Sequence, residues 1–243
     1  MMQFLKYLCL FLFIAFFASA FCYMYSLHKA RKYTHETILS DLKESQWRKP
    51  NGTARKFEIL GHDLSKRQKE IVIKVQDPGF HRHNGIDLST PGAGLTTITQ
   101  AIVKKLYFEN FKPGIAKIKQ TLIARFVVNE LIPKDDQFTL FINSMYFGNV
   151  DGKPVVGIES AANAYYHRSV KSLTEDQYIS LVAMIVMPGT FHIIDHPEWN
   201  QNRTRRIKAL IAGEYKPKGL MDQFYGELPQ EIIDAGLPPA SYP

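Results

Sequence analysis

Hydrophobic residues occupy the N-terminal part of the chain almost without interruption. From Tyr7 to Tyr25 the sequence contains no charged residue and no proline, and Ser19 is the single serine in it. These nineteen residues would extend over about 28 Å as an α-helix, which matches the hydrocarbon thickness of a bilayer. Basic residues flank the run, with Lys6 before it and Lys29, Arg31 and Lys32 after it. The pattern predicts one transmembrane helix within residues 1–27.

A cleaved signal peptide is the alternative interpretation of this segment. Ala18-Ser19-Ala20 resembles a signal-peptidase site, and the apolar run before it has the length of a signal-peptide core. The apolar stretch continues past this site to Tyr25, which favours an uncleaved anchor. The basic residues after the span argue weakly against a cytoplasmic N-terminus, so charge alone does not fix the orientation.

The rest of the chain has mainly helical periodicity, with turn residues between the helical segments. We expect residues 28–55 to form a juxtamembrane helix followed by a turn. Ser65 is a suitable N-cap, and Thr174 with Gln177 forms the pattern of a capping box. The pattern predicts helices at residues 65–75, 97–107, 113–131, 134–146, 158–167, 174–187 and 200–212, and a weak strand at 56–60. We expect one domain at residues 56–214, followed by a proline-rich tail at 215–243 that is either wrapped or loosely ordered.

Composition agrees with one globular domain of about 200 residues behind the anchor. Hydrophobic residues make up 45% of the 243 residues and charged residues 22%, a usual balance for a chain that buries a core. Both cysteines, Cys9 and Cys22, lie in the apolar segment, which excludes a cysteine-ligated zinc site or a disulfide within the domain. The net charge of +7 favours anionic partners. The chain has no nucleic-acid-binding motif, so we expect no nucleic acid among these partners.

Polar residues recur along one face of the helix expected at residues 97–107. Thr97, Gln100 and Lys104 are spaced i, i+3 and i+7, which aligns a hydroxyl, an amide and an ammonium group. Such a stripe suits phosphate and sugar groups, and the free N–H groups at the helix start favour anions. A solvated helix surface is the alternative interpretation of this stripe.

Two further sets of polar residues can be interpreted in the same two ways. Lys117 and Gln120 share a helical face, and Lys112 adds positive charge before them. His81 and His83 are as well explained by surface positions as by metal binding, and we predict no protein-held metal.

Four short segments, at residues 76–87, 94–104, 117–120 and 143–162, together resemble glycosyltransferase family 51, the peptidoglycan glycosyltransferases. The resemblance is to the monofunctional, single-domain type with an N-terminal anchor. The first family motif is Glu-Asp-x-x-Phe-x-x-His-x-Gly. Asp77, Phe80, His83 and Gly85 match it in spacing, and Gln76 stands at the position of the glutamate.

The remaining motifs are matched in part. The second, Gly-Gly-Ser-Thr-Ile-Thr-Gln-Gln-x-x-Lys, is matched at Gly94, Thr97, Ile98, Thr99, Gln100 and Lys104, and departs at Leu95, Thr96 and Ala101. In the third, Arg-Lys-x-x-Glu, Lys117 matches, Ala116 replaces the arginine and Gln120 replaces the glutamate. A family arginine between these two motifs corresponds to Lys112. The fourth motif is retained at Asn143, Tyr146, Phe147, Gly148, Gly157, Ile158, Ala161 and Ala162.

The resemblance implies a mainly helical, lysozyme-like glycosyltransferase domain with a membrane-embedded lobe beside its cleft. It also implies a single-pass protein of the bacterial inner membrane whose domain faces the periplasm or extracytoplasmic space. The family polymerises lipid II, whose undecaprenyl pyrophosphate is the leaving group, in some cases with Mg²⁺ or Mn²⁺. By resemblance, the catalytic positions are Gln76 and Gln120. The substrate-binding positions are Asp77, Phe80, His83, Thr97, Gln100, Lys104, Lys112 and Lys117. Further cell-wall synthesis proteins are expected as partners.

The two glutamines change what the resemblance implies for activity. The first-motif glutamate is the proposed general base, and the third-motif glutamate is proposed to assist the pyrophosphate side. A carboxamide is far too weak a base to take a proton, and general-base assistance contributes about 10²–10⁴-fold to the rate. We therefore predict binding of lipid II or its polymer, with polymerase activity absent or severely reduced.

The two glutamines are also compatible with an active polymerase or with an engineered double mutant. An active polymerase would need a reassigned base, for which Asp77, His83, Glu109 and Glu159 are the candidates. The departures at Leu95, Ala101, Lys112 and Ala116 favour natural drift over two designed changes. Glycan hydrolysis is less suitable, because it needs a pair of carboxyl groups flanking the bond.

Overall fold

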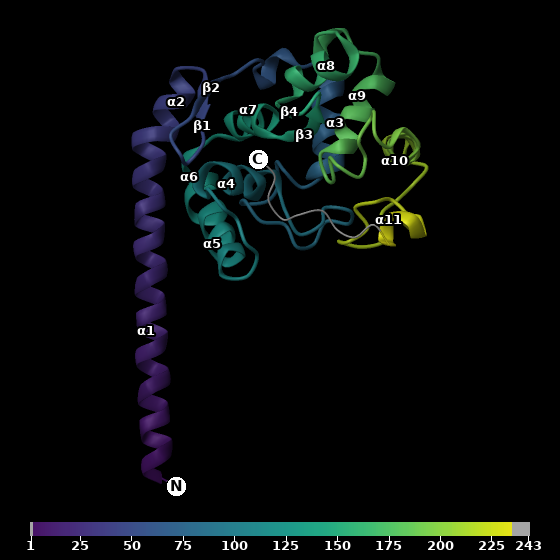
Figure 1. Cartoon of the computed structure of the whole chain (residues 1–243). Helices are drawn as coiled ribbons and strands as arrows, with labels where there is room; N and C mark the ends of the chain where they lie inside the picture. Colours follow the sequence, from purple (N-terminus) through teal and green to yellow (C-terminus); the bar gives the residue numbers. More distant parts are fainter. Residues whose placement is uncertain (1, 235–243) are drawn as a thin grey trace.

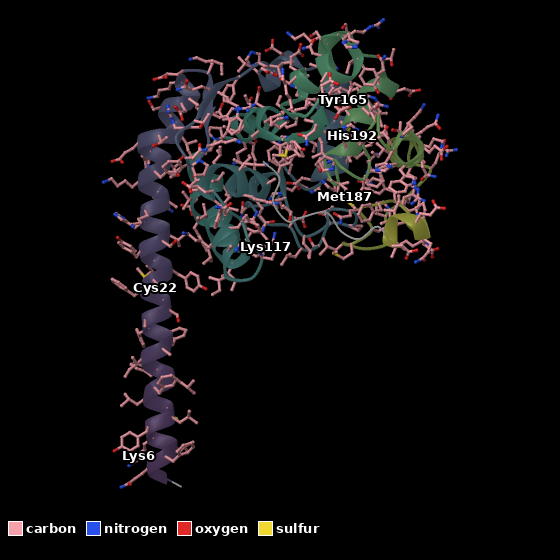
Figure 2. All side chains as sticks on the ribbon, viewed as in Figure 1. Lys6, Cys22, Lys117, Tyr165, Met187 and His192 are labelled. Atoms are coloured by element: carbon pink, nitrogen blue, oxygen red, sulfur yellow. The ribbon has the colours of Figure 1, made fainter. Side chains whose placement is uncertain are left out.

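The computed structural model describes residues 2–234, and its most extended element is the N-terminal helix α1 (Met2–Tyr33) (Figure 1). The helix continues through a π-helical segment at Thr34–Ile38 into α2 (Leu39–Lys43). The continuous segment Gln3–Lys43 has a window of mean hydropathy 2.2, none of it buried, and in the described chain it alone is long and apolar enough to cross a membrane. The side chains of Lys6 and Cys22 extend away from the helix into open space (Figure 2). The helix expected in the anchor region is therefore present, and it is consistent with single-pass anchoring.

The domain beside this helix is built mainly from short helices, which confirms the mainly helical fold. The helices are α3 (Lys66–Gln76), α4 (Ile98–Tyr107), α5 (Ile115–Ile123), α6 (Asn129–Leu131), α7 (Lys134–Ser144), α8 (Ile158–Tyr166), α9 (Glu175–Met184), α10 (Pro197–Ala212) and α11 (Gln230–Asp234). A π-helical segment at Ala124–Val128 joins α5 to α6, so the helix expected at 113–131 is continuous. Helices α4 and α7 pack together, and α9 packs against α3, α8 and α10.

Two helices form the centre of the core because they are buried on nearly every side. In α7 all residues from Gln137 to Ser144 are buried, and in α9 all residues from Tyr178 to Met184. Burying one large aliphatic or aromatic side chain contributes about 1.5–3 kcal/mol. The other helices surround these two, and α4 contributes Ile98, Ile102, Val103 and Leu106 to the same core.

Side chains at the helix starts explain where several helices begin. Ser65 accepts a hydrogen bond from Gln68 N, and Thr174 accepts one from Gln177 N, each in a capping box. These contacts satisfy backbone donors that the first turn leaves without helical partners. The helices expected after Ser65 and Thr174 are confirmed, although α9 ends at Met184, before the expected residue 187. Helix α10 begins at Pro197, ahead of the expected residue 200.

The strand expected at residues 56–60 is wrong. The chain instead forms an antiparallel hairpin from β1 (Gln46–Arg48) and β2 (Ala54–Lys56), in which Trp47 pairs with Arg55. The buried Asp41 carboxylate fixes this hairpin, because it accepts hydrogen bonds from Gln46 and from the Arg48 guanidinium. The juxtamembrane segment is therefore a helix followed by a hairpin.

A second hairpin begins at Tyr146, the last residue of the helix expected at 134–146. Helix α7 stops at Ser144, and Tyr146 begins β3 (Tyr146–Val150), which pairs with β4 (Lys153–Val156). Asp151 and Gly152 form its turn, with φ of 50° and 72°. An Asp-Gly pair is a strong signal for a hairpin turn, because both central residues need positive φ.

The described part of the C-terminal tail lies on the domain. Gly92 N donates to Gly219 O at 2.9 Å, and Gly94 N donates to Leu220 O at 2.8 Å. Tyr225 is buried, and its hydroxyl donates to Val75 O at 3.0 Å. These contacts hold residues 219–225 against the loop that leads into α4. Residues 235–243 of the expected tail lie outside the described residues.

Candidate functional site

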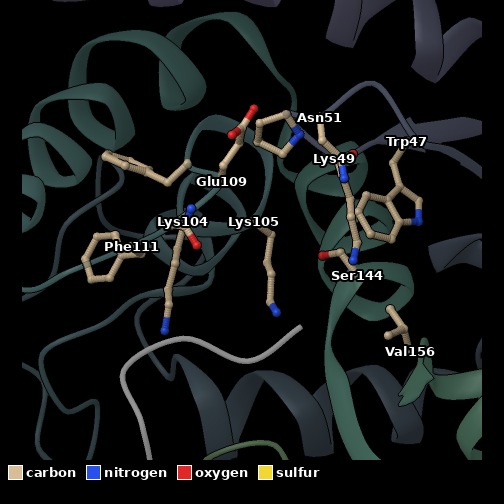
Figure 3. Close-up of a pocket in the computed structure, with 12 residues that line it drawn as sticks. Trp47, Lys49, Asn51, Lys104, Lys105, Glu109, Phe111, Ser144 and Val156 are labelled. Atoms are coloured by element: carbon tan, nitrogen blue, oxygen red, sulfur yellow. The ribbon is translucent and has the colours of Figure 1, made fainter. Parts of the chain in front are cut away.

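Two adjoining cavities meet at helix α4 and share the side chains of Lys104 and Lys105. The first has a volume of about 420 Å³ and lies between α4, the loop after it and the β1–β2 hairpin (Figure 3). The second has a volume of about 260 Å³ and lies between α4, the end of α3 and the tail. We call the two cavities together the cleft.

Gln76, the last residue of α3, lines the second cavity together with Thr96, Thr97 and the two shared lysines. Its amide Nε2 is 3.5 Å from Val182 O, which is at the limit for a hydrogen bond. None of the described residues lining this cavity is an aspartate, a glutamate or a histidine. Gln76 therefore lines a cavity whose described lining has lysines and an arginine but no carboxylate.

Gln120 does not line either cavity of the cleft. Its side chain is buried with 1% exposure, and its Nε2 donates to the backbone oxygen of Gln100 at 2.6 Å. Its Oε1 is buried and has no hydrogen-bond partner. The two glutamines thus lie in different environments, with Gln76 in the cleft and Gln120 packed against α4.

Asp77 joins three segments of the site from a fully buried position. Its carboxylate lies 2.9 Å from His83 Nε2, and it also accepts a hydrogen bond from Ile98 N at the start of α4. Carboxylates at a helix start stabilise the exposed N–H groups and the helix dipole. Phe80 is also fully buried, and the ammonium group of Lys134 lies 4.6 Å from the centre of its ring. These three motif residues hold the end of α3 against the start of α4, and a role in ligand binding stays a prediction.

Thr97 and Gln100 form the N-terminal cap of α4. Thr97 Oγ1 accepts from Gln100 N and donates to Gly85 O, while Gln100 Oε1 accepts from Thr97 N. Gln100 Nε2 donates to Thr121 Oγ1 at 3.0 Å. Both side chains are buried, so the predicted stripe begins with residues whose polar groups are already engaged. Of the three residues predicted to form a polar stripe on this helix, Thr97 and Lys104 line the cleft, and Gln100 does not.

The predicted lysines lie at different depths around α4. Burial lowers the pKa of Lys104, which lines both cavities. Lys117 donates to Leu95 O and Thr96 Oγ1, and burial, followed by repulsion from Lys104, lowers its pKa. Lys112 is exposed. The predicted lysines therefore differ in exposure: Lys112 is exposed, whereas Lys104 and Lys117 are partly buried. Lys117 is held against the loop that precedes Thr97.

Sequence reasoning missed three basic residues that line the cleft, namely Lys49, Lys105 and Arg203. Burial, with repulsion from Lys104 and Lys49, lowers the pKa of Lys105 to about 8. Arg203 is buried, donates to Ala183 O, and has a pKa lowered by burial to about 10. Lys105 follows Lys104 in sequence, but no local pattern connects Lys49 or Arg203 with α4.

None of the carboxylates considered as substitute bases lines the cavity that contains Gln76. Asp77 is fully buried against His83, and Glu159 accepts a hydrogen bond from Val170 N. Glu109 is exposed and lines the first cavity, where it is the single carboxylate among the described lining residues. Among residues 2–234 no group of three or more His, Cys, Asp or Glu side chains is placed to hold a metal ion. The chain's own described residues therefore do not fit a resident metal.

The described chain thus combines an apolar N-terminal helix, a mainly helical domain, and a cleft lined by two lysines from the last turn of α4. The family model described as Transglycosylase matches residues 45–212, which include the β1–β2 hairpin and the whole cleft-forming region of α3 and α4. This match covers more than half of the chain. The chain therefore belongs to the transglycosylase family, the peptidoglycan glycosyltransferases.

Similar curated proteins are much longer than this chain. Penicillin-binding protein 1F of Bacillus subtilis is 29% identical over 172 residues, which cover 65% of this chain and 23% of that protein. Penicillin-binding protein 1A of Neisseria gonorrhoeae is 26% identical over 192 residues, covering 71% and 23% respectively. Penicillin-binding protein 2a of Streptococcus pneumoniae is 27% identical over 166 residues, covering 64% and 22%. The chain thus spans less than a quarter of the length of these relatives.

Proposed function

We propose that this chain is a membrane-anchored peptidoglycan glycosyltransferase-family protein that binds lipid II or nascent glycan strands with little or no polymerase activity. The observation that carries the proposal is the lining of the second cavity. Gln76 lines this cavity together with Lys104 and Lys105, and the described lining contains no carboxylate or imidazole. The cleft has the positive charge that a pyrophosphate needs and lacks a base at the position where the family has one.

The lysines account for ligand binding in this proposal. Lys104 lines the cleft, Lys117 lies beside it, and Lys112 is exposed to solvent nearby in sequence. A partly desolvated ammonium group attracts phosphate more strongly than one in bulk water. These side chains would hold the pyrophosphate of lipid II, together with any divalent cation that the pyrophosphate itself carries.

The glutamines account for the loss of turnover. Gln76 keeps hydrogen-bonding groups for a sugar hydroxyl, but its amide oxygen cannot remove the proton as the hydroxyl attacks. The lost base assistance amounts to about 10²–10⁴-fold in rate. Gln120 adds a second change, because its amide donates to the α4 backbone where a carboxylate has no hydrogen to donate.

The membrane arrangement follows from the family proposal. The apolar helix would cross the bacterial inner membrane once, and the domain would lie on its periplasmic or extracytoplasmic side, where lipid II is polymerised. Exposed aromatic residues along the helix, such as Phe11, Phe16 and Phe21, suit contact with lipid. Further cell-wall synthesis proteins are proposed as partners.

Restoring the first glutamate tests the proposal. Gln76→Glu and the unmodified chain are each incubated with labelled lipid II and Mg²⁺ or Mn²⁺, and polymer is separated on a gel. We expect no polymer from the unmodified chain and more from Gln76→Glu, because the cavity and its lysines are retained. Efficient polymerisation by the unmodified chain would overturn the loss of activity.

An active polymerase with a reassigned base is the second candidate, and the position of Glu109 in the first cavity is the observation in its favour. If the unmodified chain makes polymer, Glu109→Gln should abolish it. Polymerisation that survives Glu109→Gln would remove this residue as the substitute base.

A further inference from the structure

The first cavity of the cleft combines lysines from two distant parts of the chain. Lys104 and Lys105 come from α4, and Lys49 comes from the turn that follows β1. Figure 3 shows the side chains of Lys49 and Lys105 extending into the same space. Glu109 is the single acidic residue among the described lining residues. Lysines are therefore the most numerous charged residues among the described residues that line this cavity.

The hairpin that carries Lys49 is held firmly in place. Asp41 is 5% exposed and lies 3.0 Å from Arg48 Nη2, and Trp47 beside it is 2% exposed. Lys49 N donates to Thr53 O at 2.9 Å, which closes the turn. A lysine on a fixed backbone loses less conformational freedom on binding than one on a mobile loop. Lys49 is thus presented to the cavity by a preorganised element.

The pKa of Lys105 is lowered by its surroundings in this cavity. Burial is the largest cause of its lowered pKa, and repulsion from Lys104 and from Lys49 adds to the effect. Like charges held together in a partly desolvated cavity favour an anion that interacts with all of them. Trp47, Phe108 and Phe111 form apolar parts of the wall.

We propose that Lys49 and Lys105, together with Lys104, form a phosphate-binding subsite for a pyrophosphate diester. This inference deepens the proposed function and rests on it, since the pyrophosphate would be that of the lipid-linked glycan. It adds two residues that no matched motif includes. It also gives the juxtamembrane hairpin a part in ligand binding, beyond connecting the anchor to the domain.

The test is isothermal titration of the full-length protein, in a neutral detergent, with a soluble P¹,P²-dialkyl pyrophosphate. We expect saturable binding by the unmodified protein and at least tenfold weaker binding by Lys49→Met and by Lys105→Met. Lys43→Met is the matched control, because Lys43 is an exposed lysine of the same juxtamembrane segment that does not line the cavity. Circular dichroism and thermal unfolding verify that each variant is folded. Unchanged affinity in both cavity variants, or an equal loss in Lys43→Met, would overturn the subsite.

Two further arms identify the source of the phosphate and separate this inference from the proposed function. Vesicles of anionic phospholipid, compared with neutral vesicles, test a headgroup as the ligand. Binding that depends on Lys49 and Lys105 only with anionic vesicles would overturn the pyrophosphate assignment. Lipid II is titrated in parallel. Retained lipid II binding in both lysine variants would refute the subsite and leave the proposed function standing. Binding of the diester without binding of lipid II would refute the proposed function and leave the phosphate-binding subsite standing.

Discussion

Replacing Gln120 by glutamate tests how far the protein has adapted to an amide at this position. Gln120 is almost completely buried, its Nε2 donates to Gln100 O at 2.6 Å, and its Oε1 has no partner. An ionised glutamate in the same conformation would place one oxygen against a backbone oxygen and the other in a site without a donor. The substituted side chain would therefore fold in its protonated form, because that form can still donate to Gln100 O.

The expected cost follows from the proton that the folded state must keep. A glutamate in the unfolded chain has a pKa of about 4.3, and each pH unit above it costs about 1.4 kcal/mol if the folded form stays neutral. At pH 7 the free energy of unfolding should fall by about 3–4 kcal/mol, while at pH 5 the loss should be about 1 kcal/mol. The sign is that of a raised carboxyl pKa, since the folded state binds more protons than the unfolded state between the two pKa values. Stability is thus retained below about pH 4.3 and lost as the pH rises.

Denaturant unfolding in detergent at about pH 5 and pH 7 measures this difference. Gln201→Glu is the matched control, because Gln201 is exposed on α10 and the same substitution there should change stability by less than about 0.5 kcal/mol. A cost below about 1 kcal/mol for Gln120→Glu at both pH values would contradict the expectation. That result would mean that the carboxylate ionises and that a lysine such as Lys117 leaves its present contacts to pair with it.

Three further predictions concern the buried Asp77 carboxylate, the Thr97 cap of α4, and Lys105 in the cleft. Asp77→Asn should lower the free energy of unfolding by about 2–4 kcal/mol, because it weakens the buried contacts to His83 and Ile98 N; a loss below about 1 kcal/mol in urea unfolding would contradict this. Thr97→Val should cost about 1–2 kcal/mol by removing the cap of α4, whereas Thr97→Ser should restore most of the stability measured in the same way. Affinity for the soluble pyrophosphate diester, whose charge is constant in this range, should fall as the pH rises through about 8. Burial, with repulsion from Lys104 and Lys49, lowers the pKa of Lys105 to about 8, and Glu109 lines the same cavity. Titration of Lys105→Met should therefore show a smaller pH dependence.

The sequence predicted helices best where a capping side chain marked their start. Ser65 and Thr174 begin α3 and α9 as expected, because a cap and the residues that follow it are local information. The hairpins were missed for different reasons. Asp151-Gly152 is a hairpin signal that was overlooked. The β1–β2 hairpin instead depends on a side-chain contact between Asp41 and Arg48, which neither the periodicity nor a turn pattern signals.

The same distinction applies to the candidate site. The ordered segments led to Gln76 and Lys104, which line the cleft, because those segments lie at the end of α3 and in α4. They also led to Asp77 and Thr97, whose polar groups hold backbone together. A sequence motif preserves the residues that shape a loop as well as those that contact a ligand, and spacing alone does not separate the two. Lys49 and Arg203 reach the cleft from distant parts of the sequence, so no local pattern could reveal them.

Binding of a lipid-linked glycan without its polymerisation is best tested by following ligand and product in one sample of the purified, unmodified full-length protein. Labelled lipid II is added with Mg²⁺ or Mn²⁺, and its binding is measured by titration. The same sample is then analysed for polymer on a gel. We expect saturable binding and no polymer, because the cleft retains its lysines and has an amide at Gln76. Polymer formation, or the absence of saturable binding, would show that the proposed function is wrong.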